Sequence, residues 1–172
     1  MKKEGNEPEL VGVLGDVRSV HNVGSIFRTA DGAGFSKLIL CGVTPEPMDR
    51  LGRLRQDFAK VALGAERSVL WEKEKTVGSA LRRLRNEGFT IIALEQSPGA
   101  RSCFALPSRL PERVALLVGS ETEGIRKRTL RQADCIIEIP MYGAKESLNV
   151  SVAFGIAAYA LAEHARITRR VI

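Results

Sequence analysis

The sequence is short of aromatic residues, cysteines and histidines, and each shortage excludes a class of site. Aromatic side chains make up 5% of the 172 residues, too few for a protein that stacks single-stranded bases on an aromatic platform. The cysteines, Cys41, Cys103 and Cys135, lack the paired spacing of a zinc site, so we expect buried thiols in a reducing compartment. With His21 and His164 the only histidines, neither a metal cluster nor a nucleophile–base motif is indicated.

Long hydrophobic runs and targeting signals are also missing. Residues 1–9 hold two lysines with no apolar run behind them, unlike a secretory signal. The longest apolar stretch, Val150 to Ala162, falls short of the roughly 20 residues of a membrane span, and Ser151 interrupts it. We therefore expect a cytoplasmic protein with no membrane association, and a flexible tail over residues 1–9.

Basic residues outnumber acidic ones. Lysine and arginine total 26 against 20 for aspartate and glutamate, which gives a net charge of +6 and a pI near 9.5. This balance favours a polyanionic partner such as RNA, although a soluble protein that is merely basic fits nearly as well. The length predicts a single domain over residues 1–172.

Short apolar runs alternate with helical patterns, which predicts an α/β fold with a mainly parallel sheet flanked by helices. The expected strands are Leu10–Leu14, Lys37–Cys41, Ser68–Trp71, Phe89–Leu94, Val114–Val118 and Ile136–Ile139. The expected helices are Val23–Ala33, Asp57–Leu63, Val77–Asn86, Arg126–Gln132 and Leu148–His164. Residues 42–55, with two prolines and a glycine near the turns, are expected to form an irregular loop.

The first segment that breaks these patterns follows the first strand. Asn22 can cap a helix that starts at Val23, and such a helix N-terminus attracts phosphate. Arg28 falls off the apolar stripe of this helix, so we expect its side chain to be presented to solvent. An ordinary capped helix, with Arg28 paired to Asp31, explains the same residues.

The second segment follows a run that is apolar throughout. Val114–Val118 is typical of a strand buried on both faces, and it stops at Gly119. Ligands of open α/β sheets bind at the carboxyl ends of strands. Gly119 would allow a ligand close to the backbone, and Glu121 can orient a cation or a hydroxyl. A plain loop with solvated glutamates is an equally good account of this segment.

The third segment joins the last strand to a long helix. After Ile136–Ile139 comes a loop rich in small residues, and Ser147 or Asn149 can cap the helix. This strand, loop and capped helix suit a backbone pocket for a neutral nucleoside. The helix carries an apolar stripe in which we expect Val152 and Ile156 to pack in the core, and its small residues suit close contact with another helix.

Together and in this order, the three segments resemble the signature motifs of the SpoU/TrmH class of SPOUT RNA methyltransferases, from the strand before Asn22 to the helix that ends near His164. The resemblance implies a C-terminal deep trefoil knot and a homodimer. It also implies transfer of a methyl group from S-adenosylmethionine to a ribose 2′-hydroxyl of structured RNA, with tRNA expected ahead of rRNA. No DNA partner is expected.

The resemblance also assigns roles to residues. Arg28 occupies the position of the catalytic arginine of the class; because guanidinium groups stay protonated in proteins, we expect it to position substrate, not to abstract a proton. The polar residues expected around it are Asn22, Glu121, Ser147 and Asn149. The residues expected to hold the cofactor are Leu94, Gly119, Ile139, Met141 and Leu148. The residues expected to contact RNA are His21, Arg28, Arg126 and Lys127.

Two alternatives stay open. One is a base methyltransferase of the same superfamily, and the other is a non-catalytic basic RNA-binding protein that keeps a vestigial cofactor pocket. The sequence departs from the class at Thr122, where glycine is common, which predicts a local change in that loop. The three arginines within Val77–Asn86 are expected to form a solvated basic face.

Overall fold

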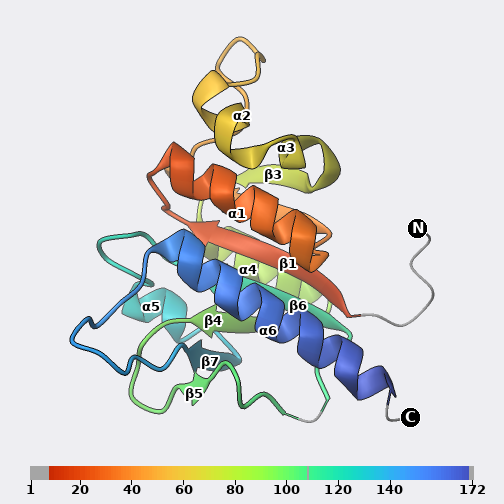
Figure 1. Ribbon diagram of the computed structural model, residues 1–172, viewed down its shortest axis with the longest axis vertical. Coiled ribbons are helices and arrows are strands. Elements are labelled where there is room, and N and C mark those ends of the chain that lie inside the picture. The colour runs from red at the N-terminus through yellow and green to blue at the C-terminus, as the bar shows by residue number, and fades with distance from the viewer. Residues whose placement is uncertain (1–7, 108, 171–172) are drawn as a thin grey trace.

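A computed structural model describes residues 8–107 and 109–170, and within them it forms one parallel sheet with helices on both faces (Figure 1). The strands are β1 Glu9–Gly15, β2 Lys37–Cys41, β3 Leu70–Glu74, β4 Thr90–Leu94, β5 Arg101–Ser102, β6 Arg113–Val118 and β7 Cys135–Glu138. The helices are α1 Val20–Ala33, α2 Gln56–Ala62, α3 Ala65–Ser68, α4 Val77–Asn86, α5 Lys127–Leu130 and α6 Val150–Arg170. The strand order is β3-β2-β1-β6-β4-β7-β5, and every pairing is parallel, as the sequence predicts.

The order of the strands brings distant parts of the chain together. β1 pairs directly with β6, with Leu14 opposite Val118 at their carboxyl ends. β4 lies between β6 and β7, so the loops after β1, β6, β4 and β7 leave the same edge of the sheet. The first two motif segments therefore begin beside each other, although about a hundred residues separate them.

The two faces of the sheet bury different helices. Along β1, Leu10 and Leu14 face the core under α1 and α6, whereas Val11 and Val13 face the core under α4. Figure 1 shows α1 and α6 side by side on one face and α4 behind the sheet. Because β1 and β6 are buried on both faces, their near-continuous apolar runs follow from this layering.

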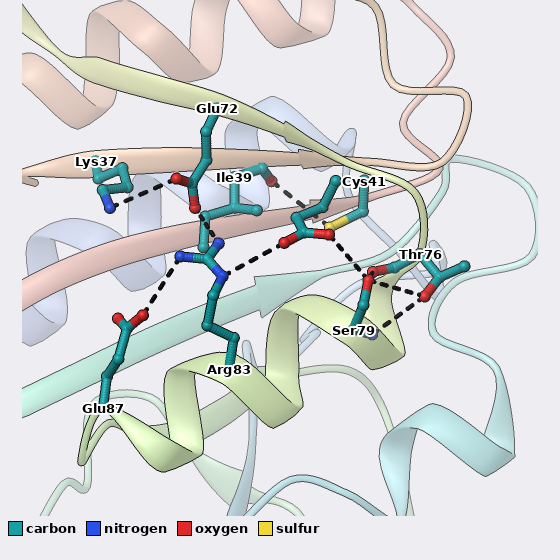
Figure 2. A network of polar contacts seen from close by, with 9 residues as sticks. Lys37, Ile39, Cys41, Glu72, Thr76, Ser79, Arg83 and Glu87 are labelled. Carbon is teal, nitrogen blue, oxygen red and sulfur yellow. Dashed lines mark hydrogen bonds and ion pairs between the residues drawn. The ribbon is translucent and has the colours of Figure 1, made fainter.

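α4 is fixed to the sheet by a polar network, shown in Figure 2. The Arg83 guanidinium reaches from α4 to Glu72 on β3, and it lies 3.3 Å from Glu74 and 3.4 Å from Glu87. The hydrogen bond with Glu72 raises the pKa of Arg83, and the other two carboxylates act in the same direction. The expectation of a uniformly solvated basic face on this helix is therefore wrong at Arg83. The Thr76 hydroxyl caps the first turn of α4 by accepting from the Ser79 N–H.

Several expected boundaries differ from the structure. Ser19, not Asn22, caps α1, and the helix begins at Val20. Ser68 ends α3, and the strand expected there runs later, from Leu70 to Glu74, because the left-handed Gly64 starts a short helix that the apolar pattern hides. β5 was not expected, since two residues are too few for a periodicity to show.

The bounds of β1, α5 and α6 also differ from the expected ones. Glu9 belongs to β1 and its carboxylate lies 3.2 Å from Arg113, so the expected tail over residues 1–9 is too long; residues 1–7 lie outside the described part. α6 begins at Val150, two residues later than expected. α5 is only the central part of the helix expected over Arg126–Gln132. Residues 42–55 form no helix or strand beyond a bridge between Met48 and Leu54.

The apolar face of α6 agrees only in part with the expected one. The residues that pack on the sheet are Phe154, Ala157, Ala158, Leu161, Ala162 and Ala165. Val152 is 50% exposed and Tyr159 45% exposed, so the expectation that Val152 packs in the core is wrong, whereas Ile156 is partly buried and packs against the core as expected. Gly32 on α1 leaves room for a side chain of α6, since a Cβ on Gly32 would lie 2.8 Å from the Tyr159 hydroxyl.

In the part of the chain that the structure describes, no helix is both long and apolar enough to cross a membrane. Within the same residues, no group of three or more His, Cys, Asp or Glu side chains is arranged to hold a metal ion. Cys41 is buried beside Glu74 and Asp16, and burial, with these carboxylates, raises the pKa of its thiol to about 12.

Candidate functional site

The loops at the carboxyl ends of β4, β6 and β7 and the start of α6 enclose a cavity of about 400 Å³, which we call the main pocket. The expected cofactor residues all line it: Leu94, Gly119, Ile139, Met141 and Leu148. Glu121, Ser147 and Asn149 line it as well, whereas Asn22, Arg28, His21, Arg126 and Lys127 do not. The volume is in the range of small-ligand sites in proteins.

A hydrogen-bonded relay joins all three motif segments at the rim of the main pocket. The Asn22 side-chain N–H₂ donates to Glu121 at 2.8 Å. The Asn22 side-chain oxygen accepts from the Asn149 N–H₂ at 3.1 Å. Because one end of the Asn22 amide serves as donor and the other as acceptor, this relay fixes the orientation of the amide. Asn22 therefore acts as a bridge between the second and third segments, and the capping role expected for it is wrong.

Glu121 closes the relay at the start of α1. Its two carboxylate oxygens accept from the backbone N–H groups of Arg18 at 3.0 Å and Ser19 at 3.1 Å, in addition to Asn22. Burial by itself would raise the pKa of Glu121, but these hydrogen bonds outweigh it and the pKa is lowered. Glu121 is thus held as a carboxylate, and it fixes the motif-1 segment against the motif-2 loop, residues 119–124.

Asn149 forms the other end of the relay by capping α6. Its side-chain oxygen accepts from the Ser151 N–H at 2.9 Å, the Ser151 hydroxyl at 2.7 Å and the Val152 N–H at 3.4 Å. Of the two residues considered for this cap, Asn149 therefore fills the role. The Ser147 hydroxyl has no hydrogen bond within the described residues and is exposed at the main pocket.

Gly119 serves a purpose beyond the one expected. A Cβ on Gly119 would lie 2.2 Å from the carbonyl carbon of Gly124, not in the main pocket. The motif-2 loop folds back on itself through a bridge between Ser120 and Gly124, and only a glycine allows this approach of backbone to backbone. Gly119 also lines the main pocket, and the expectation that it lets a ligand approach the backbone stays a prediction.

Glu95 is a site residue that the sequence analysis missed. It follows β4 directly, lines the main pocket, and its carboxylate accepts from the Ile125 N–H at 2.7 Å. A Cβ on Gly124 would lie 2.4 Å from this carboxylate, so the left-handed Gly124 leaves room for it. The signal was a charged residue directly after a buried strand, comparable to Glu121, which is the third residue after β6.

The loop between β7 and α6 keeps its backbone free at the main pocket. From residue 139 to residue 148, no backbone N–H or C=O makes a hydrogen bond to another group within the part of the chain that the structure describes. Ile139, Met141 and Leu148 in this loop line the main pocket. Backbone groups without internal partners next to a cavity are available to a polar ligand.

Arg28 does not join the relay within one chain. It lies six residues after Asn22, which places it about 120° away around the helix axis and ~9 Å along it. Its side chain is exposed, and within residues 8–107 and 109–170 it has neither the pairing with Asp31 considered as the alternative nor any other ion pair. Arg28 stands on the exposed side of α1, one turn after Gly24, which packs against α2, and one turn before Gly32, which faces Tyr159 of α6.

The remaining RNA-contact residues lie outside the main pocket. His21 and Lys127 are exposed. Arg126 lies 3.7 Å from Glu123, and Arg18 lies 4.0 Å from the same carboxylate, so Glu123 bridges two arginines at the rim of the main pocket. The structure does not test whether these residues contact RNA, and their roles stay predictions.

The comparison with known families agrees with this geometry. The model of the SpoU rRNA methylase family matches residues 9–159, from β1 into α6, and so includes every residue of the relay and of the main pocket. The chain belongs to the SpoU rRNA methylase family. The family match covers all three motif segments in one continuous alignment.

Curated relatives of this SpoU-family chain act on ribosomal RNA by name. The chain is 37% identical over 144 residues to the 23S rRNA (guanosine-2′-O-)-methyltransferase RlmB of Salmonella typhi, and 36% identical over the same length to RlmB of Escherichia coli K12. The matches cover 84% of this chain but only 56% of each relative. The chain thus spans little more than half the length of these relatives.

Solved structures of similar fold extend the likeness. An AdoMet-bound rRNA methyltransferase from Sinorhizobium meliloti superposes with a TM-score of 0.81 at 28% identity, over 92% of this chain and 57% of that one. The A. aeolicus TrmH/SpoU tRNA modifying enzyme gives a TM-score of 0.76 at 28% identity, over 96% and 78%. These neighbours confirm the SpoU-type fold; the threading of the C-terminal knot stays a prediction.

Proposed function

We propose that this chain is the methyltransferase domain of an S-adenosylmethionine-dependent enzyme that methylates a ribose 2′-hydroxyl in RNA. The observation that supports this best is the relay of Glu121, Asn22 and Asn149, which joins the three motif segments at the rim of one pocket. A structural loop would not require polar side chains from three distant segments to meet at a cavity.

The main pocket fits S-adenosylmethionine by its size and its chemistry. Its apolar wall, from Leu94, Ile139 and Leu148, suits the faces of an adenine ring. The free backbone groups between residues 139 and 148 suit the polar edge of the ring and the ribose hydroxyls. When bound, this cofactor supplies an electrophilic sulfonium methyl group.

The chain supplies position and polarity for the reaction. The ribose oxygen forms the new C–O bond as the methyl carbon leaves sulfur, and the hydroxyl proton passes to water or to a substrate phosphate. The Ser147 hydroxyl, exposed and without a partner in the described chain, is available to orient the incoming ribose. Glu121 and Asn22 hold the motif-2 loop and the start of α6 in register, so that this geometry is set before RNA binds.

Arg28 enters the site in this proposal through a homodimer. Val152 and Tyr159 form an exposed apolar stripe on α6, with the half-buried Ile156 between them, and Tyr159 lies beside Gly32, one turn after Arg28 on α1. Exposed apolar patches of this kind mark protein interfaces. A second copy seated on this stripe would bring its own Arg28 toward the main pocket, where its guanidinium can bind a phosphate next to the target ribose.

Ribosomal RNA is the substrate that we favour. Two curated relatives modify a guanosine ribose of 23S rRNA by name, which reverses the order of tRNA and rRNA expected from the sequence. The tRNA modifying enzyme among the structural neighbours keeps tRNA as an outcome to be tested.

The test uses the purified chain with labelled S-adenosylmethionine and two substrates, deproteinised 23S rRNA and total tRNA. We expect label in rRNA, and nuclease-resistant dinucleotides after digestion of the product, because a 2′-O-methyl group blocks the neighbouring phosphodiester. Label in nuclease-sensitive nucleotides would show a base methyltransferase. RNA binding and cofactor binding without any transfer would show the non-catalytic alternative. Label in tRNA alone would overturn the proposal that rRNA is the substrate.

A further inference from the structure

A second cavity, of about 290 Å³, lies on the other side of the motif-2 loop. It opens between the start of α4 and α5, where Lys75, Thr76, Arg126 and Thr129 line it. Gly119, Ser120, Glu123 and Gly124 line both this cavity and the main pocket, so one loop forms a wall of each. A polymeric ligand that lies across this loop would contact both the main pocket and the second cavity.

The elements that border this second cavity carry five cations without partners in the described chain. Lys75 lines the cavity, Arg82 stands on α4, whose residues Val77 and Gly78 line it, and Lys127, Arg128 and Arg131 stand on or next to α5, whose Thr129 lines it. We call the set Lys75, Arg82, Lys127, Arg128 and Arg131 the basic groove. All five side chains are exposed, and within the described residues none makes an ion pair or a side-chain hydrogen bond. The Arg82 guanidinium lies along the cavity, since its Nη1 atom would be 3.6 Å from a Cβ on Gly78, a lining residue.

The neighbouring basic residues show that this lack of partners is selective. On α4, Arg83 is held by three glutamates. Arg85 forms an ion pair with Asp134 at 3.1 Å, so its charge is already partnered within the chain. Arg126 shares Glu123 with Arg18. The glutamates around Arg83, together with Asp134 and Glu123, are thus already paired with other arginines, whereas Asp16, which also lines the second cavity, makes no ion pair within the described residues and accepts from the Val43 N–H. The positive charge of the basic groove is left for a ligand from outside the chain.

We propose that the basic groove binds the phosphate backbone of the substrate RNA on one side of the target nucleotide, with the strand crossing the motif-2 loop from the main pocket. This inference rests on the proposed function for the identity of the RNA. Five exposed cations on the elements that border one cavity, whose lining holds no aromatic side chain among the described residues, match a backbone and not a base, because phosphate contacts depend on charge.

The experiment measures the dissociation constant of fragmented, labelled 23S rRNA over a series of salt concentrations. Arg128→Gln/Arg131→Gln removes two charges on the α5 side, and Lys75→Gln/Arg82→Gln removes two on the α4 side. The matched control is Arg50→Gln/Lys60→Gln, which removes two exposed, unpaired cations in the loop before α2 and on α2, an element that Figure 1 places away from α5.

Each groove variant should lower the slope of log affinity against log salt by about 1.4–1.8, because each phosphate contact contributes about 0.7–0.9. The control should keep the parent slope. All variants should keep the parent affinity for S-adenosylmethionine and the parent melting temperature, since no folded contact is removed. RNA affinity and slope equal to those of the control would overturn the basic groove as an RNA site, even if methyl transfer fell. Failure of the parent chain to methylate RNA would instead count against the proposed function.

Discussion

The side-chain amide of Asn22 lies 2.8 Å from the Glu121 carboxylate, across 99 residues of sequence. The same amide accepts a hydrogen bond from Asn149, so one side chain on α1 connects the loop after β6 to the start of α6. Since Glu121 and Asn149 both line the main pocket, the shape of the pocket depends on a residue that does not line it. This makes Asn22 a positioning residue.

Replacing Asn22 separates the two roles of its amide. Asn22→Ala loses two hydrogen bonds and should lower the free energy of unfolding by about 1–2 kcal/mol. Asn22→Asp keeps the shape but places a second carboxylate against Glu121, so it should weaken S-adenosylmethionine binding more than Asn22→Ala does. Calorimetric titration with the cofactor and thermal melting measure the two effects. Equal cofactor affinities in both variants would contradict the relay.

The sequence predicted the sheet and the place of the site because both depend on simple patterns. Apolar runs such as Val114–Val118 mark strands buried on both faces, and polar breaks after parallel strands gather at one edge of the sheet. The expected cofactor residues were found at one pocket for this reason. Such reasoning needs only the direction of each strand.

What the sequence did not show depends on the direction of individual side chains. Asn22 has the right type for a cap, but Ser19 three residues earlier takes that role and leaves the Asn22 amide for Glu121. The close approach of Gly119 to Gly124 arises from a loop that folds back on itself, which no periodicity records. Arg28 was expected in the cleft because its motif is there, yet the turn of α1 carries it to another side.

The lowered pKa of Glu121 predicts a pH dependence of stability. Because the pKa of this group is below its ordinary value of 4.5 in the folded chain, its stabilising effect is complete above that value and is lost as pH falls through the lowered pKa. At about pH 7, Glu121→Gln should be less stable than the parent by about 1 kcal/mol after allowance for solvent screening. Urea denaturation at several pH values measures the difference. A difference that stays constant into acid would show that charge is not its source.

Gly119→Ala tests the folding of the motif-2 loop. The added Cβ would lie 2.2 Å from the backbone of Gly124, so the loop must open, at a cost of about 2–3 kcal/mol. Since the loop forms a wall of the main pocket, S-adenosylmethionine affinity should fall together with the melting temperature. Gly143→Ala is the matched control, because a Cβ there has no atom within 4 Å. A tolerated Gly119→Ala would mean that the loop has room that the structure does not show.

Arg28→Ala should reduce methyl transfer by about 100-fold or more, because misplacement of a reacting group by an ångström has an effect of this size. Affinity for S-adenosylmethionine should not change, since Arg28 does not line the main pocket. Single-turnover assays and cofactor titration measure the two quantities. A parallel loss of transfer and of cofactor affinity would show that Arg28 acts through the pocket of its own chain.

Mixed dimers then decide between action within one chain and action across two. Arg28→Ala and Asn149→Ala chains are each expected to be inactive, the first for lack of the arginine and the second for lack of the α6 cap. If Arg28 serves the neighbouring copy, a mixed dimer contains one site with an intact pocket and an intact arginine, so co-refolding the two chains should restore activity. Action within a single chain gives no such recovery, because every chain in the mixture has a defect. Val152→Glu, placed in the exposed stripe, should abolish the recovery by separating the copies while leaving the monomer folded.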